Sequence, residues 1–318
     1  MSALPARPLG SSGLSVSVLS MGSWRTYERL PRSAGLAVMS RARDSGISFL
    51  DDARYDDETG MAPIPTGYSE MVFGELFRAA GWPRDEVVVA NKLWWEFWPE
   101  QNAAEELDGS LRRMGLDHID LGYSAPPPEG LLLHDLVGQV AGLVASGKLR
   151  AWGVLNWTPA MVAETISIAE AHGWPKPCAA QLAYNLVHRS EVEDPLMSEV
   201  LSSGGVSVVA SSVLASGALT GKYGAAGAEG RLAGETGNPR HRSALGAAGE
   251  LRGMARDLGT NPAALAIAFA LANPLVCSVL FGATSPAQVT ANLEAVEVLE
   301  RLDPERVAAL RAVGDAPA

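Results

Sequence analysis

The hydrophobic and polar positions of this chain alternate between two periods along most of its length. Short runs rich in β-branched and apolar residues are followed by longer stretches with apolar residues at helical spacing. In the segment 101–114, for example, the recurring apolar positions are Ala103, Leu107, Leu111 and Met114. This alternation predicts βα units built on a parallel sheet.

Eight of the short runs are expected to be strands. They are residues 17–21, 48–53, 87–92, 118–125, 150–156, 178–183, 206–212 and 277–283. Eight strands separated by helices close most naturally as a barrel, so we predict an α/β protein with a (β/α)8 TIM barrel. We expect residues 1–318 to form a single domain, because α/β barrels routinely reach this length as one domain. The runner-up is an open, doubly wound sheet, which would usually carry G-x-G-x-x-G after its first strand, and that motif is absent here.

Three segments outside this rhythm are expected to close or cover the barrel. Residues 7–17 (RPLGSSGLSVS) indicate a β-hairpin that turns on Gly10 to Gly13 and caps the barrel bottom. Residues 56–67 (DDETGMAPIPTG) form an acidic loop rich in Gly and Pro. Residues 216–243 form a Gly-rich loop that carries Lys222, Arg231, Arg240 and Arg242. Long loops of this kind in compact domains are typically lids or binding loops, here at the C-terminal mouth.

Charge and composition narrow the classes of partner. The formal net charge of −11 argues against binding nucleic acid or an anionic membrane surface, because both need a basic face. It does not argue against one phosphorylated cofactor. Cys178 and Cys277 lack metal-type spacing and are expected to be buried thiols, so no metal site is predicted. With no apolar leader and no run of membrane-spanning length, we expect a cytoplasmic protein.

Candidate chemistry gathers where the predicted strands end, which is where barrel enzymes carry their functional residues. The residues at the ends of strands two to seven are Asp51, Lys92, Ala125, Asn156, Gln181 and Ser211, and Tyr55 follows strand two. A lysine kept charged by a carboxylate can lower the pKa of a nearby phenol from about 10 toward a working range. Such a tyrosine could give its proton to a carbonyl oxygen. For each residue alone, a solvated position on the rim is the alternative.

Tryptophan is concentrated at the same strand ends. The residues concerned are Trp24, Trp94, Trp95, Trp98 and Trp157. Tryptophans are commonly core residues, and one or two of these could be. Five on loops at one mouth are better explained as the apolar wall of a substrate pocket, together with Ala125.

At these residues the sequence resembles the aldo-keto reductase superfamily, roughly over residues 7–315. The segments that carry the resemblance follow in order: LGSSGLSVSVLSMGSW, GISFLDDARY, VVVANK, RRMGLDHIDL, WGVLNW, QLAYNLVHR, LASGALTGKY and LFGATSPAQVTANLEAV. Within the superfamily, the chain is most similar to the bacterial branch related to the potassium-channel β subunits. The resemblance implies the barrel predicted above, an NADP(H) cofactor and hydride transfer to or from a carbonyl or alcohol.

The resemblance also implies roles for individual residues. Asp51, Tyr55 and Lys92 match the catalytic Asp, Tyr and Lys. The cofactor-binding residues would be Gly22, Ser23 and Trp24 beside the nicotinamide, Asn156 and Gln181 on its carboxamide, Ser211 after strand seven, Lys222 and Arg231 along the phosphates, and Thr284, Gln288 and Asn292 around the adenosine. For the last three, a helix cap and exposed helix polar residues are the alternatives.

The sequence departs from the family pattern at four places. Ala125 stands where the catalytic His is expected, so one oriented donor is missing. Asp51 and Tyr55 are one residue closer than usual and the following loop is longer, which makes Tyr68 a reserve candidate for the proton donor. Ser211 replaces a frequent aromatic, and Ala291 replaces a frequent adenine-contacting Glu.

Three functions are therefore compared. The leading hypothesis is an NADP(H)-dependent oxidoreductase acting on a small carbonyl or alcohol substrate, slow because of Ala125. The second is a cofactor-binding regulatory or redox-sensing protein with vestigial turnover, and the third is a phosphate-binding barrel isomerase or lyase without nicotinamide. An oligomer is compatible with each of them.

Overall fold

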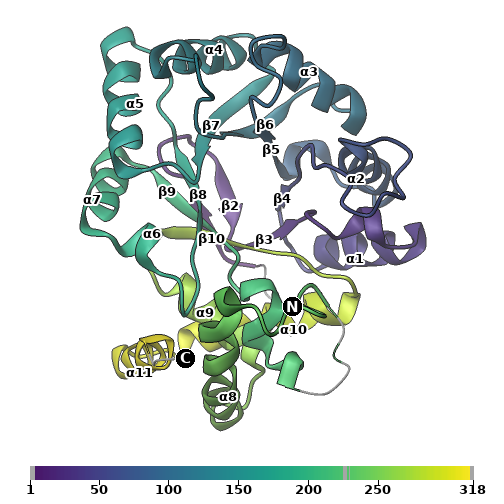
Figure 1. Cartoon of the computed structure of the whole chain (residues 1–318), viewed down its shortest axis with the longest axis vertical. Coiled ribbons are helices and arrows are strands. Elements are labelled where there is room, and N and C mark those ends of the chain that lie inside the picture. The colour runs from purple at the N-terminus through teal and green to yellow at the C-terminus, as the bar shows by residue number, and fades with distance from the viewer. Residues whose placement is uncertain (1–3, 225–227, 229, 316–318) are drawn as a thin grey trace.

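The computed structural model describes residues 4–224, 228 and 230–315, and its centre is a closed barrel of eight parallel strands (Figure 1). The strands pair in the order β10-β3-β4-β5-β6-β7-β8-β9. Their bounds are β3 (Leu19–Gly22), β4 (Phe49–Asp51), β5 (Val88–Leu93), β6 (Ile119–Ser124), β7 (Leu149–Leu155), β8 (Ala179–Ala183), β9 (Ser207–Ser211) and β10 (Val276–Phe281). Each predicted strand overlaps one of these, so the predicted TIM barrel is confirmed.

Helices surround the barrel and cover the outward faces of its strands (Figure 1). They are α1 (Arg32–Asp44), α2 (Tyr68–Ala79), α3 (Ala103–Met114), α4 (Leu133–Ala145), α5 (Pro159–His172), α6 (Ser190–Glu193), α7 (Pro195–Gly204), α8 (Arg242–Asp257), α9 (Pro262–Leu271), α10 (Pro286–Glu300) and α11 (Pro304–Asp315). The α3 helix begins with a capping box formed by Asn102 and Glu105 and ends at Gly115, in the left-handed conformation. In the described part of the chain, no helix is long and apolar enough to cross a membrane.

The N-terminal hairpin closes the end of the barrel opposite the C-terminal ends of its strands. Strands β1 (Ala6–Pro8) and β2 (Ser15–Ser17) pair antiparallel, as predicted. Gly10 has a φ of 51°, and its amide donates to Ser207 Oγ at 2.9 Å. A Cβ at this position would lie 2.0 Å from the carbonyl oxygen of Cys178, so only glycine allows the turn to reach the barrel.

Two apolar clusters make up the core. The inner one fills the barrel and contains small and medium side chains such as Ala90, Leu121, Ala151 and Val209, with Leu9 of the hairpin below them. The outer one lies between the outward faces of the strands and the helices. The inner cluster leaves the barrel filled, which places any ligand at its mouth.

The predicted loop 216–243 is less irregular than its sequence suggests. It contains short 3-10 helices at Ala215–Thr220, Lys222–Gly224 and Pro239–His241, and Arg242 already begins α8. Residues 225–227 and 229 of this segment lie outside the described residues. Short 3-10 helices have no apolar periodicity, so a Gly-rich sequence conceals them.

The packing of α2 against α3 gives a stability prediction. A Cβ added at Gly74 in α2 would lie 2.0 Å from the carbonyl oxygen of Met114. We expect Gly74→Ala to lower the free energy of unfolding by about 1–3 kcal/mol, because the backbone of α3 would have to move. Gly142 in α4 has no atom within 4 Å of its added Cβ, and Gly142→Ala should raise stability by up to about 1 kcal/mol. Urea unfolding of both variants measures the two effects, and equal effects would contradict the packing described here.

Candidate active site

Three side chains predicted to converge do so at the C-terminal mouth of the barrel. Asp51 ends β4 and Lys92 lies near the end of the neighbouring β5. Lys92 Nζ lies 2.5 Å from Asp51 Oδ1 and 3.3 Å from the hydroxyl oxygen of Tyr55. The side chains of Lys92 and Asp51 are only 4% and 2% exposed, so this is a buried ion pair. A buried lysine needs such a partner to remain charged.

Gln181 provides a second hydrogen bond to the Asp51 carboxylate. Its Nε2 donates to Asp51 Oδ2 at 3.0 Å from β8, across the barrel interior. Both oxygens of Asp51 therefore accept a hydrogen bond, one from Lys92 and one from Gln181. This contact holds the carboxylate in place and fixes the amide orientation of Gln181.

A tight turn compensates for the short spacing between Asp51 and Tyr55. The amide of Tyr55 donates to the carbonyl of Ala53 at 3.0 Å, and the Tyr55 carbonyl accepts from Gly67 at 2.9 Å. The Tyr55 ring packs near that of Trp94, with centroids 6.3 Å apart. These contacts direct the phenol toward Lys92 without the usual fifth residue.

The pKa of Tyr55 is shifted in the direction opposite to that expected from the sequence. Burial raises it well above its ordinary value of 10, and the negative charges of Asp51 and Asp52 raise it further. The charge of Arg231 acts in the other direction. The expectation of a lowered pKa is wrong for this state, because Lys92 is already bound to Asp51 and burial dominates. The phenol is consequently held in its protonated form.

Tyr68, the reserve candidate, is held elsewhere. It begins α2, and its hydroxyl accepts from Arg32 of α1 at 2.8 Å. The Arg32 guanidinium also lies over the Tyr68 ring, 5.5 Å from its centroid. The whole phenol is thus bound to α1, whereas Tyr55 is the tyrosine beside Lys92.

The five tryptophans divide into two groups. Trp24 is 41% exposed at the mouth, and Trp94 and Trp98 are partly buried. Trp95 and Trp157 are each 2% exposed and belong to the core. Trp95 donates to Ser124 Oγ at 2.9 Å, next to Ala125, which is itself 8% exposed. In this state only the first group presents surface that a pocket could use.

The residues implied for cofactor binding form an arc around the mouth. Gly22 and Ser211 end β3 and β9, and Asn156 directly follows β7. Gln181 lies in the middle of β8 rather than at its end, and Lys222 and Arg231 lie on the segment after β9. Gln288 in the first turn of α10 accepts from the amide and the hydroxyl of Thr284, at 2.8 and 3.2 Å. Ser285, not Thr284, caps α10, and Asn292 is buried at 4% exposure. The amide of Gln288 donates to Ser285 Oγ at 3.3 Å, and Pro286 at the first position of the helix has no amide hydrogen.

Backbone strain is concentrated at the same end of the barrel. Six of the described residues other than glycine have a positive φ: Arg25, Trp95, Asn156, Ser212, Ala215 and Ser216. All of them follow a barrel strand, β3, β5, β7 or β9. Such conformations cost of order 1–3 kcal/mol each and cluster at functional sites. The strain therefore marks the mouth independently of the residue types found there.

Two buried charged groups near the site were missed by sequence reasoning. Asp52 is fully buried, and its Oδ1 accepts from Ser23 Oγ, but its Oδ2 has no partner among the described residues. Arg54 is 4% exposed and lies 2.6 Å from Glu96, while Glu106 accepts from the amides of Trp94 and Trp95. Their adjacency to Asp51 and Tyr55 was the only signal in the sequence, since charged residues are usually expected on the surface.

Comparison with known proteins agrees with this geometry. The model of the aldo/keto reductase family matches residues 18–315. This chain belongs to the aldo/keto reductase family. A probable voltage-gated potassium channel subunit beta from Oryza sativa is 33% identical, over 96% of this chain and 95% of that protein. Similar proteins from Schizosaccharomyces pombe and Arabidopsis thaliana are each 30% identical, over 95% and 93% of this chain and 91% and 92% of theirs. The predicted relation of this aldo/keto reductase to the channel β branch is thereby confirmed.

Asp52 gives a prediction about stability and pH. Burial and the charge of Glu70 raise the pKa of this carboxyl well above its ordinary value. A carboxyl with a raised folded pKa favours the protonated form, so its contribution to stability is present at low pH and is lost as pH rises. We expect Asp52→Asn to remove this loss. Its unfolding free energy should fall less between pH 5 and pH 8 than that of the wild type.

Urea unfolding at the two pH values measures this difference. Asp44→Asn is the control, because Asp44 is an exposed carboxylate paired with Arg43. Identical pH dependence in the wild type and Asp52→Asn would show that Asp52 ionises as easily in the folded protein as in the unfolded chain.

Proposed function

We propose that this protein is an NADP(H)-dependent oxidoreductase that transfers a hydride between the nicotinamide and a small carbonyl or alcohol substrate. The observation that carries the proposal is the Tyr55 hydroxyl 3.3 Å from Lys92, whose charge is maintained by Asp51. The family membership of the chain supports the same reaction class.

In this proposal Tyr55 is the proton donor, and Lys92 stabilises the phenolate that Tyr55 becomes. During reduction, the carbonyl carbon gains the hydride and the carbonyl oxygen takes the proton of Tyr55. The phenolate left behind lies 3.3 Å from Lys92, whose positive charge stabilises it until a solvent proton restores the phenol. Oxidation reverses these steps. The raised pKa of Tyr55 keeps the proton in place before substrate arrives.

The residues present fit the expected cofactor. When bound, NADP(H) supplies or accepts the hydride. We propose that the strained turn at Asn156, the start of α10 at Ser285 and the cations Lys222 and Arg231 bind its amide and phosphate groups. The Asn156 side chain is exposed at the mouth with a φ of 56°, as expected for a residue held ready for a ligand.

Ala125 limits the expected rate. Ala125 directly follows β6 at the mouth, and its methyl group cannot donate a hydrogen bond to a carbonyl. An oriented donor typically contributes about two to four orders of magnitude to such a step. We therefore propose a slow reductase rather than a fast one.

The assignment of Tyr55 is tested by two matched variants. Tyr55→Phe should lower the single-turnover rate of NADPH oxidation by about two to four orders of magnitude, because the proton donor is removed. Its affinity for NADPH should stay nearly unchanged. Tyr68→Phe should change the rate much less, since Arg32 holds that hydroxyl. Stopped-flow measurements with an aldehyde give these single-turnover rates. An active Tyr55→Phe enzyme would show that Tyr55 is not the proton donor.

Cofactor preference is the second test. Lys222 and Arg231 supply positive charge, and no acidic residue lies within 284–292 to bind the ribose diol. We expect tighter binding of NADPH than of NADH. Lys222→Met should weaken NADPH binding by about tenfold or more, because Lys222 is proposed to contact a phosphate. Lys148→Met is the control and should have little effect on binding, since Lys148 is a half-buried lysine already paired with Asp108. Fluorescence titration measures both affinities, and equal or tighter NADH binding would refute the preference.

A further inference from the structure

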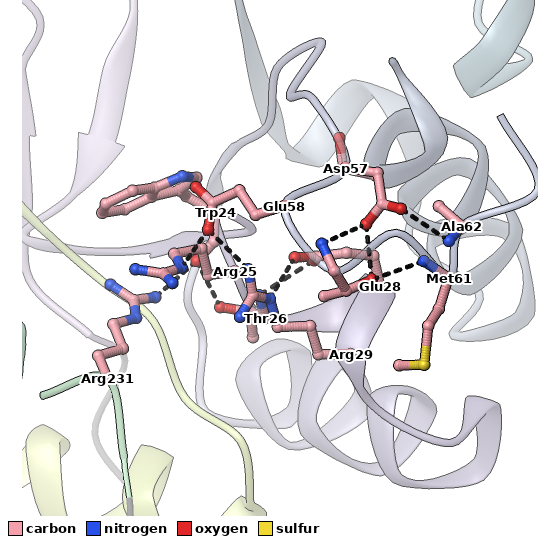
Figure 2. A network of polar contacts seen from close by, with 12 residues as sticks. Trp24, Arg25, Thr26, Glu28, Arg29, Asp57, Glu58, Met61, Ala62 and Arg231 are labelled. Atoms are coloured by element: carbon pink, nitrogen blue, oxygen red, sulfur yellow. Dashed lines mark hydrogen bonds and ion pairs between the residues drawn. The ribbon is translucent and has the colours of Figure 1, made fainter. Parts of the chain in front are cut away.

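The acidic loop 56–67 is folded against the mouth as an ordered strap. Asp56 and Thr66 form an isolated antiparallel bridge at its base. The Asp57 carboxylate accepts from the amides of Thr59 and Ala62, at 2.8 and 2.9 Å, and shapes the turn between them (Figure 2). These contacts leave the neighbouring Glu58 directed toward the segment that follows β3.

Glu58 binds two arginines of that segment. Its Oε2 lies 2.7 Å from Arg25 Nε and 2.9 Å from an Arg29 terminal nitrogen. Figure 2 shows Glu58, Arg25 and Arg29 together beside Trp24. One carboxylate oxygen therefore contacts two guanidinium groups that come from a different loop, and the Arg29 guanidinium also lies 3.2 Å from Glu28 Oε1 of its own segment.

Arg25 retains unused capacity to bind an anion. Arg25 Nε is buried, and although Glu58 is close, the N–H has no aligned hydrogen-bond acceptor among the described residues. Arg25 is also one of the six strained residues, with a φ of 54°. Its guanidinium lies 5.6 Å from the Trp24 ring centroid, and that of Arg231 lies 5.1 Å from it. The positive charge of Arg25, after burial, lowers the pKa of Arg231, so the cations are mutually repelled.

The cavity beside Tyr55 is too small for a substrate while Glu58 is in place. Its lining includes Trp24, Tyr55, the two arginines Arg25 and Arg29, and the four carboxylates of Glu28, Asp56, Asp57 and Glu58, and its volume is about 20 Å³. That volume admits about one water molecule. A substrate that reaches Tyr55 through this cavity has to displace Glu58 and the strap.

We propose that the substrate carries a carboxylate, which replaces Glu58 against Arg25 and Arg29 when the strap 56–67 opens. Arginine guanidinium groups match a carboxylate in a paired geometry, and the displaced Glu58 is exposed enough to be solvated outside. The carbonyl of the same molecule then lies near Tyr55, which lines the cavity. This inference rests on the proposed reductase function and adds a substrate class to it, the oxo-carboxylates.

Binding of benzoate tests the anion site without catalysis. Benzoate and the neutral benzyl alcohol are titrated into the full-length protein, with and without saturating NADP⁺, and tryptophan fluorescence is followed. Benzoate should bind and benzyl alcohol should bind much more weakly. Glu58→Gln should tighten benzoate binding by about tenfold, because it removes the carboxylate that competes with benzoate for Arg25 and Arg29. Arg25→Met and Arg29→Met should each weaken it.

The control is Glu75→Gln, which breaks the comparable exposed pair between Glu75 and Arg32. It makes the same change in net charge and should leave benzoate affinity unchanged. Equal tightening in Glu58→Gln and Glu75→Gln would show a general charge effect and overturn the proposal. Loss of benzoate binding in NADP⁺ would also overturn it, since benzoate would then occupy the cofactor's phosphate site.

Turnover separates this inference from the proposed function. The ratio of kcat/KM for 4-carboxybenzaldehyde over benzaldehyde should exceed one, rise in Glu58→Gln and fall in Arg29→Met. Reduction of both aldehydes at equal efficiency in all variants would refute the carboxylate-binding site and leave the proposed reductase function unaffected. Failure to reduce any aldehyde, with benzoate binding intact, would instead count against the reductase function alone.

Discussion

The burial of a lysine charge at the mouth of the barrel is the constraint on which the site depends. Lys92 is 4% exposed, and removing its partner would leave an uncompensated charge at a cost of about 3–5 kcal/mol. Asp51 supplies that partner from the adjacent strand, and Gln181 fixes the carboxylate from across the barrel. The closed barrel is what brings these positions, far apart in sequence, to one point. Tyr55 gains a nearby cation because the ion pair is already formed.

Much of the fold could be predicted because its signals are local. Each βα unit carries its own change of period, and eight such units favour closure, so the strand ends and the convergence of Asp51, Tyr55 and Lys92 followed from their places in the sequence. The direction of the Tyr55 pKa shift could not be predicted the same way. It depends on how far burial and the charges of Asp51 and Asp52 outweigh one lysine, which only the packed structure sets. The division of the tryptophans, with Trp95 and Trp157 in the core, depends on packing for the same reason.

The loops illustrate the other limit of sequence reasoning. Composition identified 56–67 as a segment without helix or strand, but gave no sign that Glu58 would bind Arg25 and Arg29. Contacts between two irregular loops leave no periodic pattern in the sequence from which they could be predicted. Arg54 is a related case, since its buried position between the loops after β4 and β5 runs against the usual exposure of arginine. In both cases a charge pair joins neighbouring βα loops, so the mouth behaves as a connected surface rather than as eight separate turns.

The filled interior has a consequence for how protons move. Below Lys92 the barrel contains apolar side chains such as Phe49 and Leu121. The hydroxyl of Tyr123, which pairs in register with Lys92, has no partner among the described residues. The hairpin at Gly10 covers the far end. No hydrogen-bonded chain through these described residues reaches the ion pair from below. Under the proposed chemistry, the proton lost by Tyr55 is replaced from solvent through the same opening that admits the substrate. Reprotonation of Tyr55 and release of the product therefore use the same opening.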